Sequence, residues 1–185
     1  MENPTYSIVI RPCAIPKLAP FAAMLNDFVG DKIEIIRLSD TKLSTLNDAL
    51  KTITNDVVIV IEERFVGLEK SFQSLADLAF SKNVIAGPRS NAIGRPNYSP
   101  VAPARFDAAT LLRFCDRWGI EQENVDTDWI DNAAFAVTKQ TLETLNYFDE
   151  RYSTMKFSFA DFLQRASTIG VKPVVADHVY FPAAS

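Results

Sequence analysis

The feature that most constrains this chain is a run of five β-branched residues, Val57 to Ile61, directly after Asp56. The run is continuously apolar, whereas a strand with one wet face alternates apolar and polar residues. It is typical of a central strand in a parallel sheet whose two faces are both covered by helices. The run is also far shorter than the roughly 20 apolar residues of a helix that crosses a bilayer. The sequence therefore predicts an α/β fold.

Strand-like and helix-like segments alternate along the rest of the first half. Segments rich in β-branched residues are separated by stretches in which apolar residues recur at helical spacing. The strands are expected at 6–10, 33–36 and 84–86, and the helices at 17–29, 43–53 and 68–81. Asp40 or Thr41 is the expected N-cap of the second helix, and Gly87-Pro88 is expected to end the last of these strands. This order predicts right-handed βαβ crossovers in a mostly parallel sheet, sandwiched by helices in three layers.

The second half begins with a proline-rich segment, residues 89–105, which is expected to be a loop. Beyond it, helices are expected at 107–118, 139–145 and 160–169, and strands at 133–137, 174–176 and 179–181. No Gly/Ser-rich or charge-block linker divides the 185 residues. We therefore expect a single domain over residues 1–185, with halves of about 1–88 and 89–185.

Composition argues against several classes of function. The net charge is −4 and the 19 Lys and Arg residues are scattered, which disfavours a nucleic-acid surface and a polybasic membrane anchor. The first residues have neither the basic start nor the long apolar stretch of a signal peptide, so a cytoplasmic location is expected. A Rossmann dehydrogenase or P-loop NTPase is disfavoured because neither glycine-rich signature is present. Another type of nucleotide-binding α/β protein remains a third interpretation.

Several short segments, taken in order, carry a resemblance. In the first half they are SIVI at 7–10, EII at 34–36 with Ser39-Asp40, NDAL at 47–50 and DVVIVIEER at 56–64. In the second half they are the strand at 133–137, FDERY at 148–152, DFLQRA at 161–166 and Gly170. Together they resemble the inverting family-2 glycosyltransferases of the GT-A fold, which carry "GGFDERF" and "EDxDLxxRxxxxG" in the second half. The resemblance implies a GT-A-like fold with a nucleotide-binding first half and an acceptor-side second half.

What the resemblance implies about function is a sugar transfer. The donor would be a UDP- or GDP-sugar, and the acceptor a hydroxyl of a saccharide or protein. Pro12, Ser39 and Asp40 match positions that line the nucleobase pocket in relatives, and this role needs no metal. Asp131 and Asn132 match the start of the acceptor-side loop.

The sequence departs from the family where the donor's cation would bind. Mg²⁺ and Mn²⁺ prefer carboxylate oxygens, which the two Asp of the family's DxD motif supply. Here those positions hold Glu62 and Arg64. Glu62 could still ligate a metal or bond the ribose, whereas the guanidinium of Arg64 has no acceptor atom with which to ligate a metal. A late His that often completes the site in relatives aligns with Phe181, while His178 is expected on the opposite face of the strand. We therefore predict no metal site and no required cofactor. Arg64 either binds the diphosphate in place of the cation or is a solvated arginine.

The family's catalytic base is also replaced. The base is a carboxylate of the "ED" pair, which takes the proton of the acceptor hydroxyl. The aligned positions hold Ser158 and Phe159, and neither side chain can act as a base. Asp161, one helical turn farther on, is either a substitute base or the partner of Arg165 at i+4, and we favour the second interpretation.

Two functions follow from these departures. The first is a glycosyltransferase-like domain, metal-independent or impaired, in which Arg64 stabilises the leaving diphosphate. The second is an inactive pseudoglycosyltransferase that serves as a binding or assembly subunit, with a protein partner or a second copy of itself.

Overall fold

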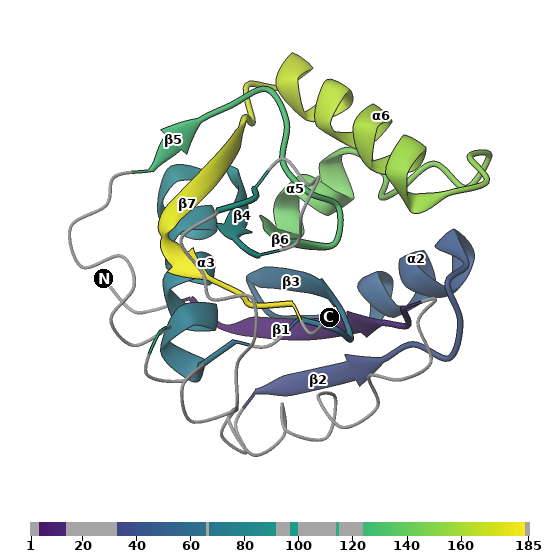
Figure 1. Ribbon diagram of the computed structural model, residues 1–185. Coiled ribbons are helices and arrows are strands. Elements are labelled where there is room, and N and C mark those ends of the chain that lie inside the picture. The colour runs from purple at the N-terminus through teal and green to yellow at the C-terminus, as the bar shows by residue number, and fades with distance from the viewer. Residues whose placement is uncertain are drawn as a thin grey trace.

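The computed structural model describes residues 4–13, 33–65, 67–91, 97–99, 114 and 124–183. The expected helix 17–29 lies outside these residues, as do most of the proline-rich loop and nearly all of helix 107–118. Figure 1 shows how the described elements are arranged.

Seven strands of the described chain form one sheet in the order β2-β1-β3-β6-β4-β7-β5 (Figure 1). Five strands run in one direction, and β5 and β6 run against them, so the sheet is mixed but mostly parallel. The strands are β1 (Tyr6–Arg11), β2 (Glu34–Arg37), β3 (Val57–Glu62), β4 (Ile85–Arg89), β5 (Val125–Asp126), β6 (Ala134–Thr138) and β7 (Pro173–Tyr180).

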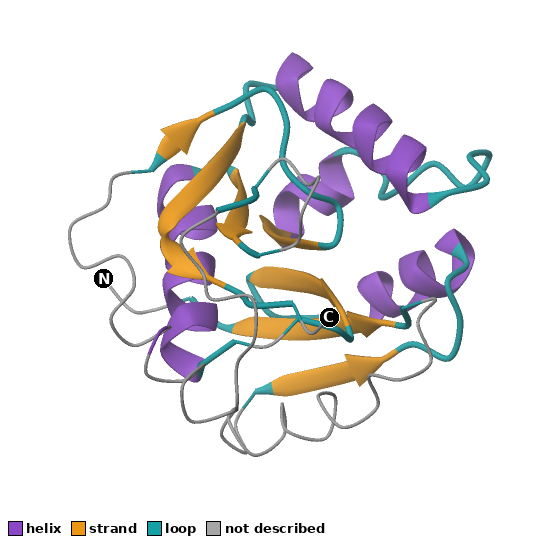
Figure 2. Ribbon diagram, viewed as in Figure 1, coloured by secondary structure: helices purple, strands orange, loops and turns teal. Residues whose placement is uncertain are grey.

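Helices cover both faces of this sheet, as the apolar run in β3 predicts (Figure 2). The helices are α2 (Leu43–Thr52), α3 (Glu69–Lys82), α5 (Lys139–Thr144) and α6 (Met155–Thr168). One core cluster joins α3 to Ile59 and Ile61, and a second joins α2, α5 and α6 to Val58 and Val60. Alternate residues of β3 thus point into opposite cores, which confirms the three-layer α/β fold.

Several element boundaries differ from the expectation. Gly87 and Pro88 do not end β4 but lie inside it. The two expected closing strands are one, β7, with a register shift: Pro88 pairs with Ala176, but Arg89 pairs with Tyr180. Residues 177–179 therefore bulge, which breaks the simple alternation used to place His178. The short strand β5 has two exposed residues and no apolar pattern that could have predicted it.

The N-cap of α2 and the start of α6 also differ from the expectation, whereas α2 begins at Leu43 as expected. The N-cap of α2 is Lys42, without a side-chain cap, and Asp40 instead accepts a hydrogen bond from the Lys42 amide at 2.9 Å. α6 begins at Met155, five residues before the expected start, because Met155 and Phe159 extend its apolar face into the core.

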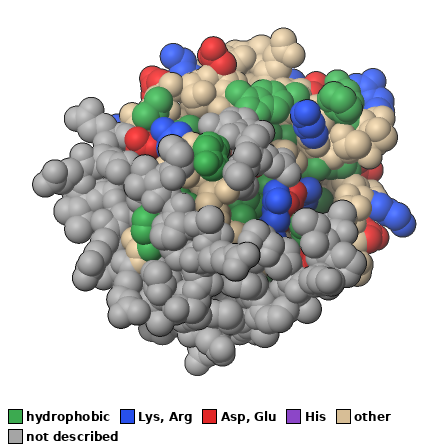
Figure 3. All heavy atoms as spheres, viewed as in Figure 1, with side chains coloured by type: hydrophobic (Ala, Val, Ile, Leu, Met, Phe, Trp, Pro, Cys, Tyr) green, Lys and Arg blue, Asp and Glu red, His purple; other side chains and the backbone are tan. Residues whose placement is uncertain are grey.

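Charged side chains of both signs are interspersed over the described surface seen in Figure 3. Along the upper edge of that view, hydrophobic side chains reach the surface over α6 and the chain between β5 and β6. Within the described ranges, no helix combines the length and apolar character that a membrane crossing requires.

Candidate functional site

The candidate site lies where β1 and β3 end side by side. Their parallel register places Arg11 opposite Glu62, each as the last residue of its strand. β2 ends at the same edge, since the Leu38 amide donates to the carbonyl of Ile10 at 2.9 Å. Ligands of open α/β sheets bind beyond the carboxyl ends of the parallel strands, so this edge is the expected place for a donor.

Three charged side chains form the centre of this edge. The Nε of Arg64 lies 2.8 Å from Oε2 of Glu62, an ion pair whose alignment falls outside hydrogen-bond geometry. Nη2 of Arg11 lies 4.0 Å from Oε1 of the same carboxylate. All three side chains are at most 14% exposed, and their formal charges sum to +1. Among these three side chains one positive charge is left over, in a place where water screens a fixed charge less than at the surface.

The guanidinium of Arg64 keeps hydrogen-bonding capacity. Its Nη2 is buried, and no residue in the described ranges accepts a hydrogen bond from it. The guanidinium carbon lies over the ring of Phe65, 5.1 Å from its centroid, which is within cation–π range. A phosphate oxygen is the kind of acceptor that such a fork binds.

Arg11 belongs to the site although sequence reasoning missed it. It is 6% exposed, and its Nη1 donates to the carbonyl of Asn132 at 3.0 Å. The contact ties the end of β1 to the chain that enters β6. In the sequence, Arg11 lies between the expected strand 6–10 and Pro12, and no motif marks it as a site residue. Arg11 directly follows the strand expected at 6–10, just as Glu62 directly follows the apolar run 57–61. This correspondence was the signal that could have identified Arg11 as a neighbour of Glu62.

The predicted acceptor-side residues shape the chain beside this cluster. Asp131 and Asn132 are both buried, and Oδ1 of Asp131 accepts the amide of Ala133 at 3.0 Å. Asn97, which sequence reasoning also missed, accepts the Asp131 amide at 3.2 Å and donates to the carbonyl of Pro88 at 2.8 Å. These bonds fix the entry to β6, and the Asp131 contact serves the backbone rather than an open surface.

The remaining donor-side residues lie along the same edge. Pro12 is half-buried and Ser39 is exposed. Hydrogen bonds from the Lys42 amide and the Thr45 hydroxyl hold the pKa of the Asp40 carboxyl below its usual range. Glu63 turns away from its neighbours and accepts the amide of Cys13 at 2.9 Å. Asp40 thus presents a carboxylate next to the end of β2.

Asp161 does not share contacts with the Arg64 cluster. Its Oδ2 lies 2.7 Å from Nε of Arg165, the i,i+4 pair that the sequence favoured. Arg165 in turn donates to the carbonyls of Leu145 and of Tyr147, the latter at 2.9 Å. Asp161 and Arg165 line a separate cleft of about 470 Å³ between α2, α6 and the chain after α5. The pair therefore holds the loop after α5 in place.

The two positions aligned with the family's base are both inside the protein. Ser158 and Phe159 are 0% exposed. The Ser158 hydroxyl donates to the carbonyl of Asp149 at 3.0 Å, and the Phe159 ring packs 4.6 Å from that of Phe135. Neither side chain reaches a surface where an acceptor hydroxyl could lie.

The late position aligned with a metal-binding His is also part of the core. The ring of Phe181 is fully buried, 4.7 Å from the ring of Phe72. His178 is half-buried in the β7 bulge, beside the ion pair of Asp177 with Arg89. Among the described residues, no three His, Cys, Asp or Glu side chains are grouped as a metal site would require.

The residues at the end of β3 do not suit the divalent cation that the family resemblance implies. Glu62 offers one carboxylate, and both of its oxygens face guanidinium groups. Arg64 has no lone pair for a metal and would repel one. The donor set at this position is therefore wrong for Mg²⁺ or Mn²⁺.

Comparison with solved structures identifies the architecture. A mannosyltransferase, PcManGT from Pyrobaculum calidifontis, in complex with GDP-Man and Mn²⁺, superposes over 99% of this chain with a TM-score of 0.65 and 14% identity. The chain has a GT-A-like glycosyltransferase fold. S. aureus TarS, residues 1–349, matches over 97% with a TM-score of 0.56 and 9% identity. GalNAc-T7 with UDP, GalNAc and Mn²⁺ matches over 97% with a TM-score of 0.57 and 11% identity.

This GT-A-like domain is smaller than the chains it resembles. It spans 57% of the PcManGT chain, 60% of the TarS chain and 43% of the GalNAc-T7 chain. No protein-family profile matches its sequence, and no curated protein sequence matches it. The structural matches at 9–14% identity thus show the fold alone, and function has to be argued from the site itself.

Proposed function

We propose that this GT-A-like domain binds a UDP- or GDP-sugar through its diphosphate without a divalent cation, and that Arg64 supplies the positive charge. The observation that carries the proposal is the pairing of Glu62 with Arg64 at 2.8 Å, with Arg11 behind the same carboxylate. The carboxylate is neutralised within the cluster, and one positive charge is left over. Nη2 of Arg64, unpartnered among the described residues, then meets a phosphate oxygen.

The nucleotide would lie along the edge formed by β1 and β2. Pro12, Ser39 and Asp40 follow those strands, and the Asp40 carboxylate is ionised at neutral pH, as an aspartate with an ordinary or lowered pKa is. An ionised carboxylate can accept hydrogen bonds from the donor groups of a nucleobase or ribose. On the other side of the cluster, the fixed chain around Asp131 and Asn132 would border the sugar and its acceptor.

In a transfer reaction, the acceptor hydroxyl oxygen forms a bond to the anomeric carbon of the sugar while the bond from that carbon to the diphosphate breaks. The nucleoside diphosphate leaves with an added negative charge, which Arg64 would offset. The hydroxyl proton must pass to a base. Asp161 is the candidate for that role, but its carboxylate is engaged by Arg165 at 2.7 Å. We therefore expect transfer to be slow at best.

This engaged carboxylate and the buried Ser158 and Phe159 favour a second candidate function. In it, the GT-A-like domain is a pseudoglycosyltransferase that retains the fold as a binding or assembly subunit, with a protein partner or another copy of itself. Both candidates are compatible with a cytoplasmic location. They differ in whether nucleotide binding and turnover persist.

Isothermal titration with UDP and with GDP, each with and without Mn²⁺, tests the proposal. We expect binding that Mn²⁺ does not strengthen, and an affinity loss of about tenfold or more in Arg64→Ala. Lys82→Ala is the matched control, since it removes the same charge at the end of α3, on the opposite edge of the sheet. Binding that requires Mn²⁺, or equal affinity in the two variants, would contradict the proposal.

The second candidate is separated by two measurements on the same protein. Absence of UDP and GDP binding at millimolar ligand favours a subunit without nucleotide function. If nucleotide binds, release of UDP or GDP from the nucleotide-sugar in the presence of saccharide acceptors reports turnover. Asp161→Asn that lowers turnover without lowering the unfolding free energy would assign Asp161 as the base. Loss of stability with unchanged turnover assigns it to the Arg165 pair.

A further inference from the structure

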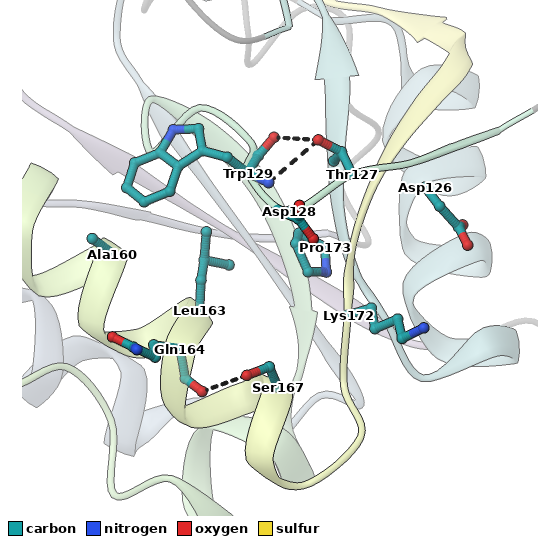
Figure 4. A pocket seen from close by; sticks show the side chains of 10 residues that line it. All are labelled: Asp126, Thr127, Asp128, Trp129, Ala160, Leu163, Gln164, Ser167, Lys172 and Pro173. Atoms are coloured by element: carbon teal, nitrogen blue, oxygen red, sulfur yellow. Dashed lines mark hydrogen bonds between the residues drawn. The ribbon is translucent and has the colours of Figure 1, made fainter.

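A cleft separate from the one that Asp161 and Arg165 line opens between α6 and the outermost strands of the sheet, β7 and β5 (Figure 4). Its volume is about 600 Å³, within the range of small-molecule sites, about 300–1,000 Å³. The described side chains that form its walls combine apolar and polar groups: Thr127, Asp128, Trp129, Leu163, Gln164 and Pro173. Proteins bind small ligands in clefts of this composition, with an apolar floor and a few placed polar groups.

This cleft is distinct from the Arg64 cluster. Pro173 is the first residue of β7, and β7 runs in the same direction as β3. The start of β7 is therefore at the end of the sheet where the parallel strands begin, whereas Glu62 and Arg64 are at the end where these strands finish. A ligand in this cleft would not compete with a nucleotide at the other edge.

Trp129 is held in a fixed position at the wall of the cleft. Its amide donates to Oγ1 of Thr127 at 3.3 Å, and the Thr127 hydroxyl donates to the Trp129 carbonyl at 3.1 Å (Figure 4). The next residue, Ile130, is fully buried, and the ring of Phe159 meets the indole edge-on at 6.5 Å between centroids. Thr127 thus holds the backbone of Trp129, and Phe159 packs against its partly buried indole. A ligand that binds against this side chain would therefore cost little conformational entropy.

The polar side chains at the cleft select against anions. Asp126 and Asp128 are exposed carboxylates, and Lys172 is the one cationic side chain among the lining residues that the structure describes. In Figure 4, Lys172 points away from the hollow that Trp129, Leu163 and Gln164 surround. The net negative charge disfavours phosphates, nucleotides and uronic acids. Carboxylate and amide oxygens next to an aromatic ring instead suit a neutral ligand that is rich in hydroxyl groups.

We propose that this cleft is a saccharide-binding site for a neutral glycan. The apolar C–H face of a pyranose ring would lie against the indole of Trp129, which excludes water from both surfaces. Ring hydroxyls would donate to the carboxylate of Asp128 and bond to the amide of Gln164, both of which belong to residues that line the cleft. Hydrogen bonds to a charged carboxylate are stronger than those between neutral groups. Together, the carboxylate and the amide would fix the orientation of the sugar ring.

The site does not depend on nucleotide binding at the opposite edge. In a glycosyltransferase it would hold a distant part of an acceptor chain, and in a pseudoenzyme it would be the binding function itself. The two proposals can therefore fail separately: Trp129→Ala is expected to leave the affinity for UDP and GDP unchanged.

Fluorine NMR of the full chain labelled with 5-fluorotryptophan tests the proposal directly. The chain has two tryptophans, so two signals are expected, and Trp118→Phe assigns that of Trp129. The probes are the neutral tetrasaccharides of β-1,4-glucose, β-1,4-mannose, α-1,6-mannose and β-1,4-N-acetylglucosamine. At least one is expected to shift the Trp129 signal in a saturable way at millimolar concentration, while UDP leaves that signal in place.

Variants then locate the bound sugar. Trp129→Ala is expected to weaken binding about tenfold or more, and Trp129→Phe to recover part of the loss. Gln164 is exposed on α6, so Gln164→Ala should fold normally and weaken binding several-fold. Gln140→Ala, at an exposed position of α5, is its matched control and should bind as the unaltered chain does.

Three results would overturn the proposal. One is that no tetrasaccharide shifts the Trp129 signal at ten millimolar. Another is that the Gln164→Ala and Gln140→Ala variants bind equally well. The third is that a lysine-containing tetrapeptide shifts the Trp129 signal where the saccharides do not, which would assign the acidic cleft to a basic peptide.

Discussion

Glu62 and Arg64 pair with each other at the end of β3, with 2.8 Å between Oε2 and Nε. The residue between them turns the other way, since Glu63 accepts the amide of Cys13. Arg11 approaches the free side of the Glu62 carboxylate from the neighbouring strand. In the function that we propose, the charge of Arg64 would take the place of a cation, and Glu62 would orient Arg64 rather than bind a metal.

The variant Glu62→Gln tests how the negative charge of Glu62 affects the binding of UDP at this cluster. The formal charge of the cluster would rise from +1 to +2, because the amide no longer neutralises either guanidinium. We expect UDP to bind about three- to tenfold more tightly at low salt, since a fixed positive charge near a partly buried site attracts the diphosphate more strongly. The gain should shrink as salt is raised. Titration calorimetry at 50 and 500 mM NaCl gives both numbers.

The control for this variant is Glu69→Gln, which removes the same charge at an exposed position in the first turn of α3. It should change UDP affinity little at either salt concentration. Glu62→Gln should also lower the free energy of unfolding by about 1–3 kcal/mol, because a charged contact in a poorly hydrated place is lost. A fall in UDP affinity would instead mean that Glu62 contacts the ligand itself or that the orientation it gives Arg64 outweighs its charge.

Asn47 is expected to be a major source of stability in the second core. It is buried on α2, and its side chain donates to the Phe148 carbonyl at 2.8 Å and accepts the Phe148 amide at 3.1 Å. Its Nδ2 also donates to Oε1 of Glu150 at 2.8 Å. Asn47→Ala leaves both backbone groups of Phe148 unpaired, so we expect a loss of about 2–4 kcal/mol in urea unfolding.

Glu150→Ala provides the comparison, because it removes only the exposed member of this network. Its cost should stay below about 1 kcal/mol. If the two variants are equally destabilised, the carboxylate and not the backbone bonds would carry the network. The result matters for function because these bonds hold the FDERY segment, in which Asp149 pairs with Arg151 and serves the fold.

The central sheet could be predicted because local and tertiary signals agree there. The run Val57–Ile61 is apolar on both faces, and each face meets its own core. The i,i+4 pair of Asp161 with Arg165 was predictable for the same reason, since both residues lie on one helix. Spacing along the chain is sufficient where the partners are near in sequence.

The candidate site was only half predictable, because its contacts join distant segments. Arg11 reaches the carbonyl of Asn132, 121 residues away, and Asn97 bridges β4 to the entry of β6. Backbone carbonyls and amides leave no residue-type signal, so no motif marks either partner. The bulge at 177–179 is likewise set by the pairing of Arg89 with Tyr180 rather than by its own residues.

Gly87 has a packing role that the sequence does not indicate, because a glycine before Pro88 suggests only the end of a strand. A Cβ atom at this position would lie 2.5 Å from Nδ2 of Asn97 and 3.1 Å from Cβ of Ile130. Gly87→Ala should push Asn97 off the Pro88 carbonyl and cost about 1–3 kcal/mol of unfolding free energy. Chemical denaturation measures the cost, and backbone NMR shifts at Asn97 and Asp131 report the displacement.

Gly170→Ala is the matched variant, because a Cβ at Gly170 would meet nothing within 4 Å although its φ is +80°. It should cost about 1 kcal/mol from backbone strain alone and leave the Asn97 signals in place. Unmoved Asn97 signals in Gly87→Ala would show that the sheet tolerates a side chain there and would remove this account of the glycine.

His178 should make stability depend on pH near neutrality. Burial lowers the pKa of its imidazole below the ordinary 6.5, although Asp177 acts in the opposite direction. The unfolded chain therefore binds a proton more readily than the folded chain as pH falls below about 6.5. Stability is complete above that pH and is lost as pH falls from 6.5 through the lower pKa of the folded state. Urea midpoints at pH 7.5, 6.5 and 5.5 should decrease in that order.

The assignment of this slope is unusually direct, because His178 is the one histidine in the sequence. Other side chains with ordinary pKa values titrate outside the window from pH 5.5 to 7.5, apart from any thiol with a lowered pKa. His178→Gln should flatten the dependence while preserving the midpoint at pH 7.5 to within a small shift. A variant that keeps the full slope would show that the proton is taken up elsewhere, and the ion pair of Asp177 with Arg89 beside the bulge would be the next group to examine.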